Sequence, residues 1–285
     1  MDVSGGTLQR VAQVSSGGKS PCYIALDQTA RFALVGNYSD GAFGVFAIDA
    51  DGRLRHPTAR MVIPGSSVHR ERQEASHAHC FLTDPSNRFA LGVDLGADCV
   101  HVFRFDAATG ELTPHEPAQF RARPGAGPRH LRFHPDGRFA FIVNELTCTV
   151  SVCTWDAERG VLHETQHASS LPEGFSGANT SAELMVHPDG RTLYVSNRGA
   201  DAIAIFSIAP DTRQLTLLEQ TASLGGRPRN MVIHPDGHWL LVANQDGNSI
   251  AVFAIDPGTG RLAPHGEPIP VENPGCLRFV VPGGR

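Results

Sequence analysis

The sequence of 285 residues has no long apolar run and no block of like charge. No apolar stretch approaches the length that spans a bilayer, and the opening residues MDVSGGTLQRV lack the charged start and apolar core of a signal peptide. The formal net charge of −5 includes no basic cluster. We therefore expect a cytoplasmic protein with neither a membrane nor a nucleic-acid partner.

Three further patterns are missing. The six cysteines form no CxxC pair, which favours buried, reduced thiols. The sequence contains no GxSxG, so serine hydrolase chemistry has no support. No long window has the period of an amphipathic helix. The chain must therefore build its core from strands.

A motif of HPDGR, apolar residues and Asn recurs along the chain. HPDGRFAFIVN (134–144) returns at 187–197 and 234–244, with weaker copies at 27–37 and 84–94. The closing Asn or Asp residues are 57, 50, 53 and 47 residues apart, and each is followed by a second apolar run and a turn. Such a period indicates a repeat architecture.

The Pro-Asp-Gly turn folds its flanking runs into an antiparallel hairpin. Four short strands per unit at this period match a propeller blade. We predict an all-β fold, a β-propeller of four-stranded antiparallel blades, with five full units plus terminal fragments. No linker interrupts the period, so residues 1–285 are predicted to form a single domain.

The turns are constant, whereas the opposite ends of the hairpins vary and are polar. In a hairpin, the residue that enters the first strand lies beside the residue that leaves the second. This predicts four groups of neighbours: Arg129 and His130 with Asn144 and Glu145; His77 and His79 with Asp94; Asn179 with Asn197 and Arg198; Arg229 and Asn230 with Asn244 and Gln245. If the blades surround one axis, these groups meet at the central channel. Arginines, histidines and one carboxylate there suit a small anionic ligand and proton transfer.

Several segments, in this order along the chain, resemble the seven-bladed propeller lactonases: ERQEASHAH (71–79), GPRHLRFHPDGRFAFIVNE (127–145), LPEGFSGANTSAEL (171–184), YVSNRGADAIAIF (194–206), and RPRN with VANQDGNSIAVF. The best-known activity of that family is 6-phosphogluconolactonase, and a fungal relative is the carboxy-cis,cis-muconate cyclase. The resemblance implies a catalytic group of one His, two Arg and one Glu. These fall on His79, with His77 as the competing choice, and on Arg129, Glu145 and Arg198.

The expected reaction is hydrolysis of 6-phospho-D-glucono-1,5-lactone to 6-phosphogluconate, a step of the pentose phosphate pathway, without a metal or other cofactor. Glu145 or His79 would act as general base on water, and Arg129 would stabilise the oxyanion. Arg198 and Arg229 would hold the phosphate or a carboxylate. Further substrate contacts are predicted for the remaining rim residues: His77, His130, Asn144, Asn197, Asn244 and Gln245. If Glu145 lies at a rim, Glu145→Gln should lose turnover with little change in the fold.

Other interpretations stay open. Glu145 and Arg129 could form a structural ion pair, and His77, His79 and Asp94 resemble a metal-binding set. The family also includes lactone-forming cyclases, and a propeller can bind an anionic metabolite without catalysis. The three His residues that open the HPDG turns are predicted to be structural.

The chain departs from the family pattern at its N-terminus, where only twenty residues precede Pro21. Residues 1–11 resemble the tail of a unit, and 274–281 resemble an inner strand without its hairpin. A full seven-bladed ring would need more strands. We therefore expect an N-terminally short, incomplete arc, with a gap between the 1–20 and 274–285 segments.

Overall fold

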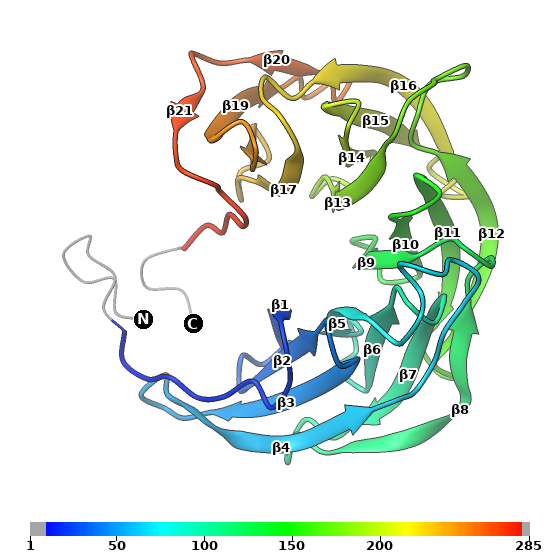
Figure 1. The fold of residues 1–285 in the computed structure, drawn as a ribbon, viewed down its shortest axis with the longest axis vertical. Coiled ribbons are helices and arrows are strands. Elements are labelled where there is room, and N and C mark those ends of the chain that lie inside the picture. Colours follow the sequence, from blue (N-terminus) through cyan, green and yellow to red (C-terminus); the bar gives the residue numbers. More distant parts are fainter. Residues whose placement is uncertain (1–9, 281–285) are drawn as a thin grey trace. The chain divides into compact units, whose positions relative to one another are not determined.

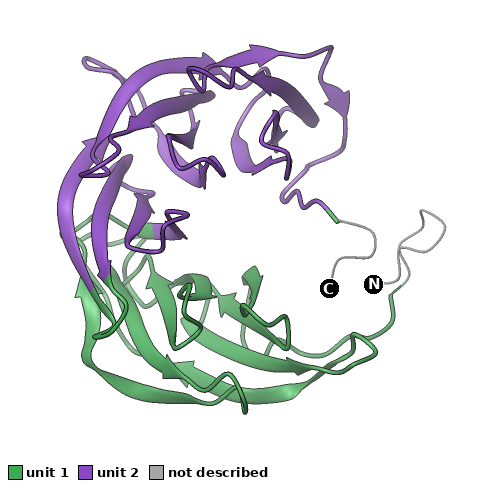
Figure 2. Ribbon diagram, turned by 180° about the vertical axis from the view of Figure 1, so that it is seen from behind, with its two compact units in different colours: residues 1–128, 156–161, 280–285 green, residues 129–155, 162–279 purple. Residues whose placement is uncertain are grey.

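The computed structural model describes residues 10–280, which form 21 β-strands (Figure 1). In this range no helix is long and apolar enough to cross a membrane. The contacts divide the chain into two compact units, coloured separately in Figure 2. Unit 1 comprises residues 1–128, 156–161 and 280–285, and unit 2 comprises residues 129–155 and 162–279. The predicted all-β fold is confirmed.

Unit 1 contains two four-stranded antiparallel sheets with strands in sequence order. The first is β1 (Pro21–Leu26), β2 (Phe32–Asn37), β3 (Ala42–Ile48) and β4 (Leu54–Val62). The second is β5 (Ala78–Thr83), β6 (Phe89–Asp94), β7 (Cys99–Phe105) and β8 (Leu112–Arg121).

Three sheets of the same kind follow, and they supply unit 2. The first is β9 (Pro128–Phe133), β10 (Phe139–Asn144), β11 (Thr149–Asp156) and β12 (Val161–Ser169). The second is β13 (Thr180–Val186), β14 (Thr192–Arg198), β15 (Ala202–Ile208) and β16 (Leu215–Ala222). The third is β17 (Pro228–Ile233), β18 (Trp239–Asn244), β19 (Ser249–Ile255) and β20 (Leu262–Pro264), and β21 (Ile269–Pro270) also pairs with β19. The five full units of the sequence are thus five sheets, each with the strand order of a blade.

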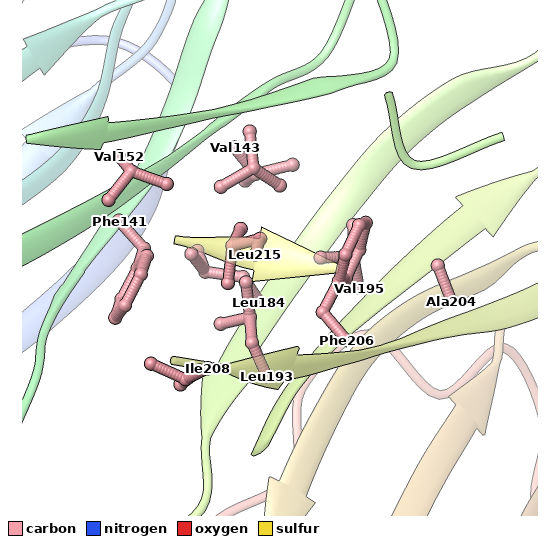
Figure 3. Packing of buried hydrophobic residues seen from close by; sticks show 11 residues of the cluster. Phe141, Val143, Val152, Leu184, Leu193, Val195, Ala204, Phe206, Ile208 and Leu215 are labelled. Carbon is pink, nitrogen blue, oxygen red and sulfur yellow. The ribbon is translucent and has the colours of Figure 1, made fainter. Parts of the chain in front are cut away.

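Burial changes systematically across each sheet. The second strands, such as β10 and β14, are apolar and almost wholly buried, because both of their faces are covered. The fourth strands, such as β4, are mostly exposed and polar. In unit 2 the apolar side chains of β10 and β11 pack against those of β13 to β16, including Phe141, Leu184 and Phe206 (Figure 3). Truncating one such buried Leu to Ala typically costs about 2–5 kcal/mol.

Two of the three HPDG turns are also joined to the next sheet through their histidine. Nε2 of His134 donates to the carbonyl of Gly190 at 3.0 Å, and Nε2 of His187 donates to the carbonyl of Gly237 at 2.8 Å. Both glycines have positive φ, +73° and +79°. A Cβ on Gly190 would lie 2.5 Å from Nε2 of His134, so glycine is required for two reasons. The structural role predicted for the turn histidines is therefore confirmed for these two.

The terminal fragments differ from the expectation where they can be compared. Residues 274–280 form no strand, and the backbone N–H of Leu277 instead donates to the side chain of Asn230. The predicted unit tail at 1–11 lies almost entirely outside the described residues, as does position 281.

Candidate functional site

Two arginines and one glutamate form a buried ion cluster in unit 2. Arg129 lies in β9, Glu145 directly follows β10, and Arg198 ends β14. One oxygen of Glu145, Oε2, is 3.0 Å from Nε of Arg129 and 2.8 Å from Nη2 of Arg198. The three side chains are at most 7% exposed. The contact of Arg129 with Glu145 was predicted from the hairpin and is confirmed, whereas Arg198 reaches the same oxygen from a neighbouring sheet.

Both arginines are anchored and charged. Nη1 of Arg129 donates to the carbonyl of Ala182 at 2.6 Å, and Nη2 of Arg198 donates to that of Ser181 at 3.1 Å. Burial lowers the pKa of Arg198 to about 10, and Glu145 opposes this shift, so the guanidinium stays protonated at neutral pH. Within residues 10–280, Nε–H of Arg198 has no hydrogen-bond acceptor. Fixed cations that have an N–H group without an acceptor can stabilise negative charge that develops on a ligand oxygen.

The burial of Glu145 corrects one expectation. Only 3% of this residue is exposed, so it is not an exposed rim residue and its replacement cannot be assumed to spare the fold. A carboxylate oxygen shared by two guanidinium groups is also poorly suited to take a proton from water. The contacts favour Glu145 as the group that positions the two arginines.

A second buried carboxylate, Glu183 in β13, was not singled out from the sequence. Its Oε1 lies 2.9 Å from Nδ1 of His130 and 3.2 Å from Nη2 of Arg132. Its Oε2 accepts a hydrogen bond of 2.6 Å from Nδ2 of Asn230. Burial alone would raise the pKa of Glu183, but the charges and hydrogen bonds around it lower the pKa to about 2. Burial lowers the pKa of His130 to about 4, against the effect of Glu183. At neutral pH we therefore expect an ionised Glu183 and a neutral His130.

The sequence did contain a signal for Glu183. His130, Glu183 and Asn230 each lie four residues before the His of an HPDG turn, so they occupy one position of three successive repeats. Glu145 and Arg198 likewise share the position after the closing Asn. Stacked repeats bring equivalent positions close together. Comparing the repeats position by position would have placed Glu183 beside His130.

The three asparagines that close the repeat motif in unit 2 use their side-chain N–H groups within the protein. Asn144, Asn197 and Asn244 are fully buried. Nδ2 of Asn144 donates to Thr149 Oγ1 at 3.1 Å, and Nδ2 of the other two donates to backbone carbonyls at 2.8 Å. These contacts favour a structural role over the predicted substrate binding.

The last hairpin has the predicted neighbours. Pro228 pairs with Asn244, and Asn230 pairs with Ala243, with a register shift between them. Gln245 is half-buried and its backbone N–H donates to the carbonyl of Arg227 at 3.0 Å. Substrate binding by Arg229 and Gln245 stays a prediction.

His77 and His79 lie in unit 1, and the rings of both contact Tyr38. The ring of His77 stacks on Tyr38 at 4.4 Å, and the ring of His79 meets Tyr38 edge-on at 5.7 Å. The two histidines therefore lie close together, as the HxH spacing suggested. The association of His79 with Arg129, Glu145 and Arg198 stays a prediction, as does substrate binding by His77.

The side-chain neighbours of Asp94 differ from the predicted metal-binding set. Asp94 Oδ1 accepts the backbone N–H of His77 at 2.8 Å, whereas Oδ2 lies 3.4 Å from Nε2 of His101. Ligand atoms of Asp94, Cys99 and His101 lie within 4.8 Å of one another. Burial raises the pKa of the Cys99 thiol, and Asp94 Oδ2 also accepts the hydroxyl of Ser76. These features describe an internal hydrogen-bond network. Among residues 10–280 the structure records no disulfide, and four of the six cysteines are buried.

The comparisons with known proteins agree with this architecture. A profile of the family described as "Lactonase, 7-bladed beta-propeller" matches residues 1–279. The chain is 32% identical over 263 residues to a Bacillus subtilis protein named 6-phosphogluconolactonase, covering 92% of this chain and 74% of that protein. The chain belongs to the seven-bladed β-propeller lactonase family. It spans only 65% of the length of a 31% identical Formosa agariphila protein, also named 6-phosphogluconolactonase.

Solved structures give the same result. A putative 6-phosphogluconolactonase from Bacteroides fragilis is 36% identical, with a TM-score of 0.90 over 98% of this chain and 78% of that one. A periplasmic gluconolactonase from Pseudomonas aeruginosa is 35% identical, with a TM-score of 0.89 over 97% of this chain and 77% of that one.

Proposed function

We propose that the protein hydrolyses 6-phospho-D-glucono-1,5-lactone to 6-phosphogluconate, in the cytoplasm and within the pentose phosphate pathway. The observation that carries this proposal is the pair of buried guanidinium groups held by the single carboxylate of Glu145. Family membership and the names of several relatives support the lactone as substrate. One structural relative is named a periplasmic gluconolactonase, so the location is to be tested separately by fractionating cells.

Ester hydrolysis needs positive charge where the carbonyl oxygen becomes an oxyanion. Arg129 and Arg198 supply this charge in fixed positions, because both are tied to backbone carbonyls and to Glu145. The two guanidinium groups therefore do not have to move when the tetrahedral intermediate forms. Removing one such donor typically costs about a hundredfold or more in rate.

The phosphate needs cations that it can reach from solvent. Besides Arg229, predicted from the sequence, the structure points to Arg227. Its side chain is 49% exposed, and within residues 10–280 its one ion pair is a long contact of 3.5 Å to Asp246. Its charge lowers the pKa of Arg198. A guanidinium group this accessible can exchange its exposed partner for phosphate oxygens.

The test is a hydrolysis assay of the full chain with three substrates: 6-phosphogluconolactone, glucono-1,5-lactone and a carboxymuconate. We expect fast hydrolysis of the phosphorylated lactone, unchanged by a chelator. Arg198→Lys should lower kcat/KM about a hundredfold, because Lys has no counterpart of the Nε–H of Arg198, the donor that has no acceptor within residues 10–280. The matched control is Arg138→Lys, since Arg138 is 72% exposed. No acceleration over spontaneous hydrolysis of either lactone would overturn the proposal, and turnover of the muconate alone would point to a cyclase.

A further inference from the structure

Arg227 has a backbone conformation that long side chains seldom adopt. Within residues 10–280, four residues combine a positive φ with a following proline. Three of them, Ser20, Gly127 and Asn273, have a short side chain or none. Arg227, at φ +58°, has a long charged side chain. A left-handed backbone costs Gly least and Asn little, and it costs a bulky residue more. The backbone therefore does not account for arginine at this position, which points to a function of its guanidinium group.

Asp201 holds this backbone from both ends of the segment 223–227. Its Oδ1 accepts the N–H of Arg227 at 2.8 Å, and its carbonyl accepts the N–H of Ser223 at 2.9 Å. The carbonyl of Arg227 accepts the N–H of Gln245 at 3.0 Å. The peptide groups on both sides of Arg227 are thus held, which determines the direction in which its side chain leaves the backbone.

The same carboxylate links Arg227 to Arg198. Asp201 follows Arg198 by three residues, in the turn after β14, and its Oδ1 also accepts the N–H of Gly199 at 3.4 Å. Besides burial, the charge of Arg227 lowers the pKa of Arg198, so the two cations lie close together. The side chain of Arg198 is 7% exposed and that of Arg227 is 49% exposed. An anion can therefore reach Arg227 from solvent, and its charge relieves the repulsion between the two arginines.

We propose that Asp201 is a positioning residue that directs Arg227 toward the phosphate group of the substrate. Together the two residues determine the preference for a phosphorylated over an unphosphorylated lactone. This inference rests on the proposed function, in which Arg198 serves the lactone carbonyl. A guanidinium group can bind two phosphate oxygens at once. One whose backbone is already fixed loses less conformational freedom on binding than one on a mobile loop.

Asp201 acts here through a hydrogen bond and not through its charge. The equivalent residue of the last repeat is Asn248, which follows the closing Asn of its motif by four residues, as Asp201 does. The neutral Oδ1 of Asn248 accepts the N–H of Asn273 at 2.8 Å, the same distance as between Asp201 and Arg227. An amide oxygen is therefore sufficient for this contact. Asparagine should be able to replace Asp201, whereas alanine should not.

The first experiment compares kcat/KM of the full chain for 6-phosphogluconolactone and for glucono-1,5-lactone. Asp201→Ala should lower the ratio of the two values about tenfold, through a higher KM for the phosphorylated lactone. Asp201→Asn should keep the ratio within about threefold of the wild type, because its amide oxygen can still accept the N–H of Arg227. The matched control is Asn248→Ala. It removes the equivalent hydrogen bond at nearly the same φ, +48° against +47°, and should leave the ratio unchanged.

Two results of this comparison would overturn the positioning role. If Asp201→Ala lowers kcat/KM equally for both lactones, the change has damaged the site as a whole and Asp201 has no specific effect on phosphate recognition. If Asp201→Asn lowers the ratio as much as Asp201→Ala does, the hydrogen bond is not the cause.

A double change tests whether Asp201 acts through Arg227. Arg227→Ala should lower the ratio about tenfold by itself. Asp201→Ala should then cause no further loss, because the side chain that Asp201 positions is already absent. A further loss as large as in the wild-type background would overturn the proposal, since Asp201 would then act independently of Arg227.

Arg227→Gly keeps the proposal testable if Asp201→Ala does not fold. Glycine suits the positive φ of this position, as Gly127 does before its own proline, so the urea midpoint should stay close to that of the wild type. The ratio of kcat/KM values should still fall about tenfold. A folded Arg227→Gly protein with the ratio of the wild type would overturn the proposal.

Binding measurements distinguish this inference from the proposed function. Calorimetric titration of the wild type with 6-phosphogluconate and with gluconate needs no turnover. We expect the phosphorylated acid to bind about tenfold more tightly, and Arg227→Gly to remove the difference. A wild type that hydrolyses a lactone but shows no preference for the phosphorylated compounds overturns this inference alone. A wild type that binds 6-phosphogluconate with the expected preference but hydrolyses neither lactone overturns the proposed function and leaves the anion site in place.

Discussion

Replacing Glu145 by glutamine should destabilise the protein as well as slow it. The carboxylate oxygen that contacts Arg129 at 3.0 Å and Arg198 at 2.8 Å is almost fully buried. At an effective dielectric constant of 20, each contact is worth about 5 kcal/mol of Coulomb energy, which largely offsets the cost of burying the charges. Gln can keep an acceptor oxygen at the position of Oε2, but it carries no charge, so both guanidinium groups lose their buried counter-charge. Removing one partner of a buried ion pair typically costs about 3–5 kcal/mol.

For a chain of this length such a loss lowers the midpoint of thermal unfolding by about 10 °C. We would measure urea and thermal midpoints of Glu145→Gln beside Glu158→Gln. Glu158 contacts Arg88 at 3.1 Å, but its side chain is 84% exposed, so its replacement should cost less than about 0.5 kcal/mol. The reasoning is refuted if the two variants unfold at the same midpoint. Adding Arg198→Gln to Glu145→Gln should cost less than the sum of the single changes, because both remove the same contact.

Three further results are expected. Gly190→Ala should cost more stability than Gly174→Ala, because both have positive φ but only a Cβ on Gly190 would meet a neighbour, His134 at 2.5 Å; equal urea midpoints would contradict this. The pKa of Asp136 is lowered from 3.8 to about 2, because its hydrogen bonds outweigh the effect of burial. Its contribution to the free energy of unfolding is therefore present above pH 4 and lost as the pH falls toward 2. In acid titrations, Asp136→Asn should lose less stability than the wild type between pH 4 and 2. Arg227→Ala should raise KM about tenfold for the phosphorylated lactone and leave glucono-1,5-lactone unaffected; parallel changes would exclude a phosphate contact.

Residue spacing alone was enough to predict the sheets. The HPDG turns determine which residues face each other in a hairpin, because a tight turn sets the register of both strands. The neighbours of Asn144, Glu145 and Arg198 within their own hairpins followed from this counting.

Contacts between sheets could not be predicted by counting residues from a turn. Glu183 and His130 are 53 residues apart, and only the stacking of neighbouring sheets brings them within 2.9 Å. The burial of Glu145 has the same origin, since its second arginine comes from another sheet. The sequence shows which residues occupy equivalent positions of the repeats, whereas the packing of the sheets determines which of those residues are in contact.

In the HxH segment, an irregularity in strand pairing makes the prediction from strict alternation wrong. Strict alternation puts His77 and His79 on one face, with Asp94 as their partner. The pairing of β5 with β6 shifts register between Ala78 and Cys80, and the backbone N–H of His77, not its ring, then faces Asp94. The ring that approaches this carboxylate belongs to His101. The sequence determined the strands and turns because these depend on neighbouring residues, whereas bulges, burial and charge pairing were decided by tertiary packing, which joins residues that the sequence holds far apart.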